Sequence, residues 1–293
     1  MKSFRSLLFL SGCLAGWAQA QVPDVAPFVE LHPSWQVRST KKSLFGWNDT
    51  MGRYSLVGLR MILEPGYRVY VAQRFQKIDN TGDPDTMDEY YVESRGHWRL
   101  GKQYLPFGRK EIVKSTVLAA RFDTDLLFDA LPISIAACDG GSGRTRGVVG
   151  RVGGPIGISV AIGNHFGIQP TDLDKFRYLD EAPGIGRGYR LALGADTNAS
   201  LGSAQLSMEW TSLRRGETDL DTDRDLSDVR LRFKLPGTQY RANMGWSRDW
   251  TDRKDFLTLE FDLQDNSKIS YMPLVRMEGL TFHDFGFSAV FKL

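Results

Sequence analysis

The stretch that decides the fold is VRLRFKLPGTQYRANMGW, residues 229–246. Every second side chain of its first seven residues is apolar, and arginines and a lysine lie between them. The pattern stops at Pro236-Gly237 and resumes as far as Trp246. Because side chains on a strand point alternately to its two faces, this pattern predicts two antiparallel strands joined by a tight turn. One face of the resulting sheet is apolar and the other is charged.

The same alternation recurs through most of the chain, as in the row Ile156, Ile158, Val160 and Ile162. We expect about 14 strands, in a range of roughly 12 to 16, most of them long enough to cross a bilayer when tilted. Their connections are of two kinds. Short turns such as residues 153–155 alternate with long polar segments, namely residues 78–89, 169–186 and 213–227. This asymmetry is typical of outer-membrane barrels, which have short periplasmic turns and long external loops.

Two architectures accept a sheet with one apolar and one charged face. A soluble sandwich of two sheets would have to protect the edges of each sheet, whereas a closed barrel in a membrane has no edges. In the barrel, Arg230, Arg232 and Lys234 line a wet lumen and the apolar side chains face lipid. The reverse assignment would cost about 2 to 4 kcal/mol for each cation near the bilayer midplane. The sequence therefore predicts an all-β fold, a transmembrane antiparallel β-barrel.

The first 20 residues have the features of a secretory signal peptide: a basic start, an apolar stretch and the small-x-small cleavage site Ala18-Gln19-Ala20. We expect residues 21–293 to form the barrel. Leu10–Cys13 also matches a lipobox, so that lipidation of Cys13 stays an alternative to cleavage after Ala20. In the mature chain Cys138 is then the one cysteine, and a lone cysteine makes no internal disulfide.

The charge balance limits the function classes. The chain has 37 basic and 35 acidic side chains and a formal net charge of +2, which argues against a nucleic-acid binder. No stretch of the mature sequence is long and apolar enough to predict a transmembrane helix.

Residues 98–108, WRLGKQYLPFG, carry a family resemblance. A strand reading Arg-x-Gly-Lys-Gln and continuing to Pro-Phe-Gly resembles the phosphate-selective porin superfamily and its relative, the siderophore porins. The matching residues are Arg99, Gly101, Lys102, Gln103, Pro106, Phe107 and Gly108. Members of the family follow this strand with a long segment folded into the barrel lumen as a constriction. The resemblance implies that residues 109–139 are that segment.

Charged side chains at a constriction set the ion selectivity of a pore, because the low-dielectric wall focuses their potential. The candidate pore-lining residues are Arg109, Lys110, Lys114, Arg121, Arg230, Arg232, Lys234, Arg241, Arg68 and Arg74. Arg60 and Arg190 share the inward parity, and the acidic residues on the inward side are Glu93, Asp196, Glu209, Glu260, Asp262 and Asp284. The balance is mildly basic, which favours a weak preference for anions. Opposite charges that pair across neighbouring strands would instead only brace the wall, and both interpretations stay open.

Catalysis and metal binding have little support. The four histidines, His32, His97, His165 and His283, cannot be assembled with a nucleophile and an orienting group into a catalytic set. The alternating aspartates of residues 217–225 would suit calcium, but the segment lacks the EF-hand spacing. We expect a solvated external loop there, bridged to lipopolysaccharide through divalent ions. The sequence predicts no enzyme, no cofactor and no specific metal site.

The sequence thus predicts a porin-like channel in the bacterial outer membrane that passes small hydrophilic solutes or ions. Its expected partners are outer-membrane lipid, lipopolysaccharide and these solutes, with no nucleic acid, and a homo-oligomer is left open. Two alternatives remain within this fold: a ligand-specific uptake barrel for a siderophore or an oxyanion, and a plugged structural or adhesive barrel.

Overall fold

The computed structural model describes residues 23–38, 43–47, 54–64, 66–75, 86–113, 116–126, 131–139, 146–166, 189–215, 223–264 and 268–293. The regular structure of these residues is entirely β-strand. The strands are β1 (Asp24–Leu31), β2 (Ser34–Arg38), β3 (Ser43–Gly46), β4 (Leu56–Glu64), β5 (Tyr67–Arg74), β6 (Met87–Ser94), β7 (Trp98–Tyr104), β8 (Thr116–Leu126), β9 (Leu131–Asp139), β10 (Arg146–Val152), β11 (Ile156–Phe166), β12 (Tyr189–Leu201), β13 (Ala204–Arg215), β14 (Arg224–Lys234), β15 (Arg241–Asp249), β16 (Lys254–Gln264), β17 (Ile269–Glu278) and β18 (Thr281–Lys292).

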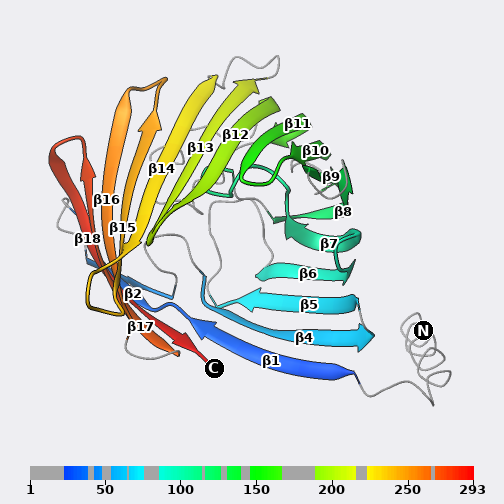
Figure 1. Cartoon of the computed structure of the whole chain (residues 1–293), viewed down its shortest axis with the longest axis horizontal. Coiled ribbons are helices and arrows are strands. Elements are labelled where there is room, and N and C mark those ends of the chain that lie inside the picture. Colours follow the sequence, from blue (N-terminus) through cyan, green and yellow to red (C-terminus); the bar gives the residue numbers. More distant parts are fainter. Residues whose placement is uncertain are drawn as a thin grey trace, which may run out of the picture.

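These strands form one antiparallel sheet that closes on itself (Figure 1). Neighbours in sequence pair with each other from β4 to β18, and β1 pairs with both β4 and β18. β2 continues β1 beyond His32-Pro33 and pairs with β18 and β3, while β1 pairs with β4. β1 and β2 are therefore two halves of one wall strand, and β3 and β4 are two halves of the next. The 18 strands of the sheet thus make a barrel of 16 wall strands. The predicted fold class is confirmed, with a strand number at the top of the expected range.

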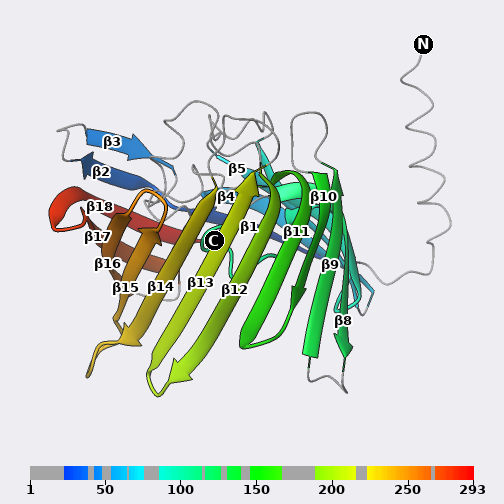
Figure 2. The ribbon, with the colours of Figure 1, turned by 90° about the horizontal axis from the view of Figure 1, so that it is seen from above.

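The two termini of the barrel meet at the closing seam. Glu30 lies opposite Lys292, and the backbone of Val29 exchanges hydrogen bonds of 3.2 and 2.9 Å with that of Leu293. The short turns between β12 and β13 and between β14 and β15 lie at the same end of the strands (Figure 2). Because closure leaves no unpaired strand edge, such a sheet satisfies its backbone polar groups within a bilayer.

The opening stretch forms the predicted hairpin of β14 and β15. Val229 lies opposite Trp246 and Leu231 opposite Met244, all on the outer face. The turn is closed by a hydrogen bond of 2.9 Å from the Leu235 amide to the Tyr240 carbonyl, and Gly237 adopts φ = 71°. Glycine pays no steric penalty at positive φ, which explains its place in this turn.

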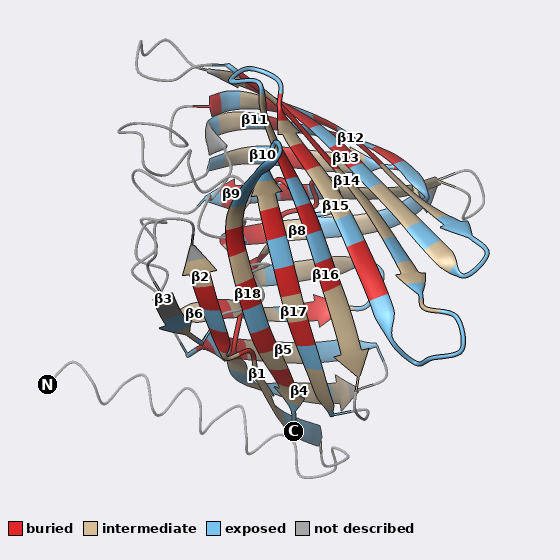
Figure 3. Cartoon of the chain, turned by 90° about the vertical axis from the view of Figure 1, so that its left-hand side faces the viewer, coloured by how far each residue is buried: buried red, intermediate tan, exposed pale blue. Residues whose placement is uncertain are grey.

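Buried and exposed side chains alternate along the strands. This alternation is expected for a barrel whose outer face contacts lipid and whose interior is filled by side chains or water. In β11 the side chains of Ile156, Ile158 and Ile162 are exposed, whereas Ser159 and Ala161 between them are buried. Figure 3 shows the same alternation as bands along β16, β17 and β18. The wall therefore has the predicted orientation, with the arginine-bearing face of the strands toward the lumen and the apolar face outward.

The expectation that residues 109–139 form one segment inside the lumen is corrected. Residues 116–126 and 131–139 are the wall strands β8 and β9, paired with each other and with β7 and β10. Their inward residues include Ala119, Ala136 and Cys138, which are buried and apolar. Both faces of these strands are thus partly apolar, so the alternation that identifies a barrel strand is weak there.

Other predictions lie outside the described residues. They include the signal peptide at residues 1–20, the lipobox at Cys13, and most of the acidic segment 217–225. No helix of the described residues is long and apolar enough to cross a membrane.

Closure predicts a specific behaviour in detergent. Without heating, the barrel is expected to stay folded in SDS and to migrate at a different position from the boiled chain, because unfolding must break a continuous ring of interstrand hydrogen bonds. Electrophoresis of paired heated and unheated samples measures this. Identical migration of the two samples would contradict a closed barrel.

Candidate functional site: a segment inserted into the lumen

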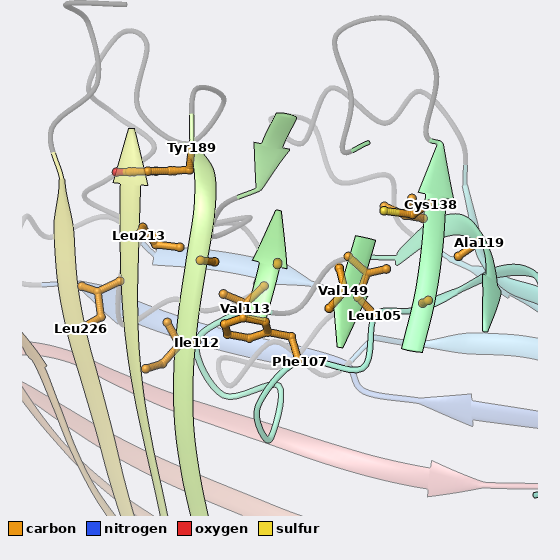
Figure 4. Packing of buried hydrophobic residues seen from close by; sticks show 14 residues of the cluster. Leu105, Phe107, Ile112, Val113, Ala119, Cys138, Val149, Tyr189, Leu213 and Leu226 are labelled. Carbon is orange, nitrogen blue, oxygen red and sulfur yellow. The ribbon is translucent and has the colours of Figure 1, made fainter. Parts of the chain in front are cut away.

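The chain leaves the wall at the end of β7 and enters the interior of the barrel before it returns to β8. We call residues 105–113, LPFGRKEIV, the inserted segment. Leu105, Phe107, Ile112 and Val113 are buried in one cluster with inward-facing residues of β8 to β14, as Figure 4 shows. The cluster fixes the segment against the wall, because each large apolar side chain buried there contributes about 1.5 to 3 kcal/mol.

Small side chains on the wall make room for the segment. The inward positions under it include Ala136, Ala161 and Ala192. At Gly194 of β12, a Cβ atom would lie 2.9 Å from two atoms of the Phe107 ring, closer than van der Waals contact allows. Gly194 thus marks the place where the phenyl ring of the Pro-Phe-Gly motif docks.

A buried carboxylate on β13 holds the turn of the segment. Oε2 of Glu209 accepts hydrogen bonds from the backbone amides of Arg109, at 2.8 Å, and Glu111, at 3.0 Å. Gly108 and Lys110 adopt positive φ angles of 51° and 64°, which wraps the turn around the carboxylate. The amide of Gly108 also donates to Oγ of Ser159 on β11, at 3.0 Å. Three backbone amides of the turn thus bond to the wall, two of them to one buried oxygen of Glu209, which makes Glu209 the central anchor.

Ion pairs fasten the segment on both sides of Glu209. Nε of Arg109 lies 2.8 Å from Oδ1 of Asp196, a carboxylate that Arg151 also contacts at 2.6 Å. Oε2 of Glu111 lies 2.6 Å from the guanidinium of Arg230, which also contacts Asp228 at 2.9 Å. The segment is therefore tied to β11, β12, β13 and β14, four neighbouring strands of one side of the barrel.

β1 and β4 to β6 form the opposite side of the barrel (Figure 1). This side and the adjoining β7 carry a different set of charges. Arg68 of β5 and Arg99 of β7 both contact the carboxylate of Glu93 on β6, the second at 2.7 Å. Arg74 is buried and contacts Asp88 at 2.6 Å, and its guanidinium lies over the Tyr54 ring. Arg74 is thus a structural cation rather than an exposed one.

The remaining sequence-predicted residues are distributed as follows. Arg121 of β8 faces inward and contacts Asp123 at 2.7 Å. Lys110 lies over the ring of Tyr104, 4.7 Å from its centroid. Arg232, Lys234 and Arg241 are exposed near the turn between β14 and β15, away from the inserted segment. Lys114 lies outside the described residues.

The motif residues of β7 position the segment. Gln103 is fully buried and its side-chain amide donates to the carbonyl of Ala119 at 3.0 Å. Nζ of Lys102 donates to the carbonyl of Met87 at 2.6 Å. Gly101 adopts φ = 131°, and a Cβ there would lie 2.8 Å from Cα of Tyr91, so only glycine fits. These contacts fix the end of β7 from which the segment departs.

Strand parity predicts that Glu209 and Asp196 face inward, but it does not predict their contact with the inserted segment. Gly194 and Ser159, which accommodate it, carried no signal apart from their small size. No group of three or more potential metal ligands occurs within the described ranges.

No protein-family model and no curated protein matches this chain. Solved structures share its fold. The anion-selective porin from Comamonas acidovorans is 11% identical, with a TM-score of 0.58 over 92% of this chain and 99% of that one. Salmonella typhi OmpF, solved in a complex with daunomycin, is 9% identical, with a TM-score of 0.58 over 92% and 97% of the two chains. OmpT of Vibrio cholerae, an outer membrane protein in a trimer form, is 8% identical, with a TM-score of 0.58 over 93% and 100%.

The fold is therefore that of outer-membrane porins, a coarser match than the phosphate-selective and siderophore porins that the motif suggested. This barrel and its apolar outer face locate the protein in the bacterial outer membrane. A homo-oligomer of this chain stays a prediction.

Proposed function

We propose that the protein is a channel for small hydrophilic solutes, narrowed by the inserted segment and weakly selective for anions. The observation that carries this proposal is the one-sided attachment of the segment, through Glu209, Asp196 and Arg230, to β11–β14. A segment held against one wall narrows the lumen. The charges on the facing wall then act on the ions and solutes that pass through it.

The anion preference is supported by the balance of charges on that facing wall. Arg60, Arg68 and Arg99 face inward there, and Glu93 is the carboxylate that contacts the last two. The corresponding charges on the segment are paired with Asp196 and Arg230. The porin from Comamonas acidovorans, described as anion-selective, has the same fold, so this barrel is compatible with such a preference.

We infer that the barrel is not an enzyme. His32 contacts Glu30 and His283 contacts Asp284, each at 2.9 Å or less, and both pairs belong to the closing seam. The same carboxylates also contact neighbouring strands, Glu30 with Lys292 at 3.6 Å and Asp284 with Arg276 at 3.4 Å, which is a structural role for both pairs.

Conductance in planar bilayers tests the channel. Stepwise currents are expected on insertion of the purified barrel, and their absence would favour the plugged structural barrel. In a salt gradient, the reversal potential is expected on the anion side. Replacing Arg60 and Arg68 together by glutamine should move it toward the cation side, since charged residues at the lumen wall set the potential that ions meet.

The matched control is Arg253→Gln, in the turn between β15 and β16, which removes a charge away from this part of the wall. Its reversal potential should equal that of the wild type. A cation-selective wild type, or equal shifts in both variants, would contradict the proposed selectivity.

A further inference from the structure

Three aromatic side chains stack on the inner wall opposite the inserted segment. The ring centroids of Phe28 on β1 and Tyr70 on β5 are 5.6 Å apart with an interplanar angle of 18°. Those of Tyr70 and Tyr91 on β6 are 5.2 Å apart at 22°. Such offset stacks are favourable for aromatic rings, and here they join strands from both sides of β4.

The register of the strands shows that these rings face the lumen. Residues directly opposite each other in neighbouring strands share a face of the sheet. Tyr70 lies opposite Tyr91, Tyr91 opposite Gly101, and Gly101 opposite Ala119. Ala119 belongs to the apolar cluster beneath the inserted segment, so all of these residues point inward.

A glycine on the intervening strand β4 makes the stack possible. Gly58 lies opposite Phe28, and a Cβ at Gly58 would be 2.7 Å from two atoms of the Phe28 ring. The ring of Phe28 can therefore lie over β4 and reach Tyr70. The three rings remain only partly buried, and lumen solutes can contact them.

Guanidinium groups cover both ends of the stack. Cζ of Arg60 lies 4.7 Å from the centroid of the Phe28 ring and 6.0 Å from that of Tyr70. Cζ of Arg99 lies 4.0 Å from the centroid of Tyr91. Stacking on a ring restricts the guanidinium plane while its N–H groups stay available to an acceptor. We call Phe28, Tyr70, Tyr91, Arg60, Arg68 and Arg99 the aromatic–arginine cluster.

The charges of the cluster do not balance. Glu93 contacts both Arg68 and Arg99, whereas Arg60 is exposed and forms no ion pair with any carboxylate of the described residues. Among the neighbouring charges, Arg74 contacts Asp88 at 2.6 Å, and Oε1 of Glu89 accepts a hydrogen bond of 3.2 Å from the backbone amide of Tyr104. Three arginines against one glutamate leave the cluster with an excess of two positive charges.

We propose that the aromatic–arginine cluster is a binding site for small carboxylates that carry an aromatic ring. The carboxylate pairs with the guanidinium of Arg60, in the way that Glu93 already pairs with Arg99. The ring of the solute contacts the exposed parts of Tyr70 and Phe28. This inference rests on the proposed channel function and specifies the class of solute that the channel concentrates.

The aromatic part of the site distinguishes this solute class from simple anions. A guanidinium fork binds a carboxylate whatever it carries. Three stacked rings beside the fork add apolar surface that acetate or chloride cannot use, and that a flat aromatic solute can cover. The site should thus select for the combination of charge and ring.

Calorimetric titration of the detergent-solubilised barrel tests the site without depending on conduction. Benzoate is expected to bind at least about threefold more tightly than acetate, and benzyl alcohol, which has the ring but no charge, should bind weakest. Arg60→Gln should weaken benzoate binding about tenfold or more. Arg232→Gln, which removes an inward cation elsewhere in the lumen, is the matched control and should leave benzoate binding unchanged.

Variants of Tyr70 separate the contribution of the stacked rings to binding from the contribution of the charge. Tyr70→Leu should bring the affinity for benzoate down toward that for acetate, while Tyr70→Phe keeps the ring and should restore the preference. Different migration of heated and unheated samples shows that each variant is folded. Equal binding of benzoate and acetate by the wild type, or no loss in folded Arg60→Gln, overturns the proposal.

Bilayer recordings distinguish failure of this site from failure of the channel. In the wild type, benzoate should interrupt the current in a concentration-dependent way that acetate does not reproduce, and Arg60→Gln should shorten the interruptions. Currents that benzoate and acetate affect equally would overturn the site and leave the channel standing. Benzoate binding without any current would overturn the channel and leave the site.

Discussion

Replacing Glu209 by alanine is expected to release the turn of the inserted segment and to raise the unitary conductance of the channel. The substitution removes the acceptor of two backbone hydrogen bonds, from Arg109 and Glu111, in a site where Glu209 is almost fully buried. A buried amide left without its acceptor costs about 1 to 3 kcal/mol, so the loss of both bonds weakens the attachment by about 2 to 6 kcal/mol.

The flanking ion pairs with Asp196 and Arg230 remain in this variant. Release is therefore expected to be partial, and single-channel recordings should show a broader distribution of conductances together with a higher mean. Adding Gly194→Val should complete the release, because a side chain at residue 194 occupies the space of the Phe107 ring. The double variant should have the higher and more uniform conductance.

Two variants serve as controls for this experiment. Glu209→Gln keeps an oxygen at the same place and should retain most of the attachment. Thr211→Val alters the next inward residue of the same strand, so it reports on changes in β13 alone. If the conductance of Glu209→Ala matched that of Thr211→Val, the inserted segment would not be the constriction.

The wall of the barrel was predictable from the sequence because its signal is local. Each strand such as β14 shows apolar and charged residues in alternation, and lipid outside with water inside enforces that pattern. The signal failed at β8 and β9, where Ala119 and Ala136 face an apolar segment instead of water. The pattern consequently predicts a lumen location for these two strands, and it predicts about 14 strands where the barrel has 16.

The site was predictable only in part because its contacts are distant in sequence. The Pro-Phe-Gly motif located the start of the inserted segment, yet Glu209 lies 100 residues after Arg109, whose amide it accepts. The alternation along a strand predicts which face of the sheet each side chain lies on. It does not predict the height along the barrel axis at which a loop crosses the lumen. The pairing of Arg230 with Glu111 depends on that height, whereas the stacking of Arg60 on Phe28 depends on the register between β1 and β4.

Replacing Asp284 by alanine is expected to be the most destabilising single change in the closing seam. Asp284 of β18 is fully buried, and its Oδ2 accepts hydrogen bonds from the side chains of Gln36 on β2, at 3.0 Å, and His283, at 2.8 Å. The buried guanidinium of Arg276 on β17 lies 3.4 Å from the same oxygen. One carboxylate thus connects three adjacent strands where the barrel closes.

Removing one partner of a buried ion pair costs about 3 to 5 kcal/mol, because the buried guanidinium of Arg276 loses this carboxylate in a site that water cannot reach. We expect a loss of this size in the free energy of unfolding of Asp284→Ala. Denaturant titration in detergent micelles, followed through the difference in migration between folded and unfolded chains, measures it. Asp262→Ala, which removes a partly exposed inward carboxylate of β16, should cost much less.

A double-mutant cycle decides whether the loss comes from the ion pair or from packing at the seam. When both charges are removed, as in Arg276→Leu with Asp284→Ala, neither charge of this pair is left behind in the seam. The double variant should therefore be more stable than Asp284→Ala alone, with a coupling energy of about 1 kcal/mol or more. Strictly additive losses would mean that Arg276 and Asp284 act independently. In that case the contact of Asp284 with Gln36 would be the one that holds β18 to β2.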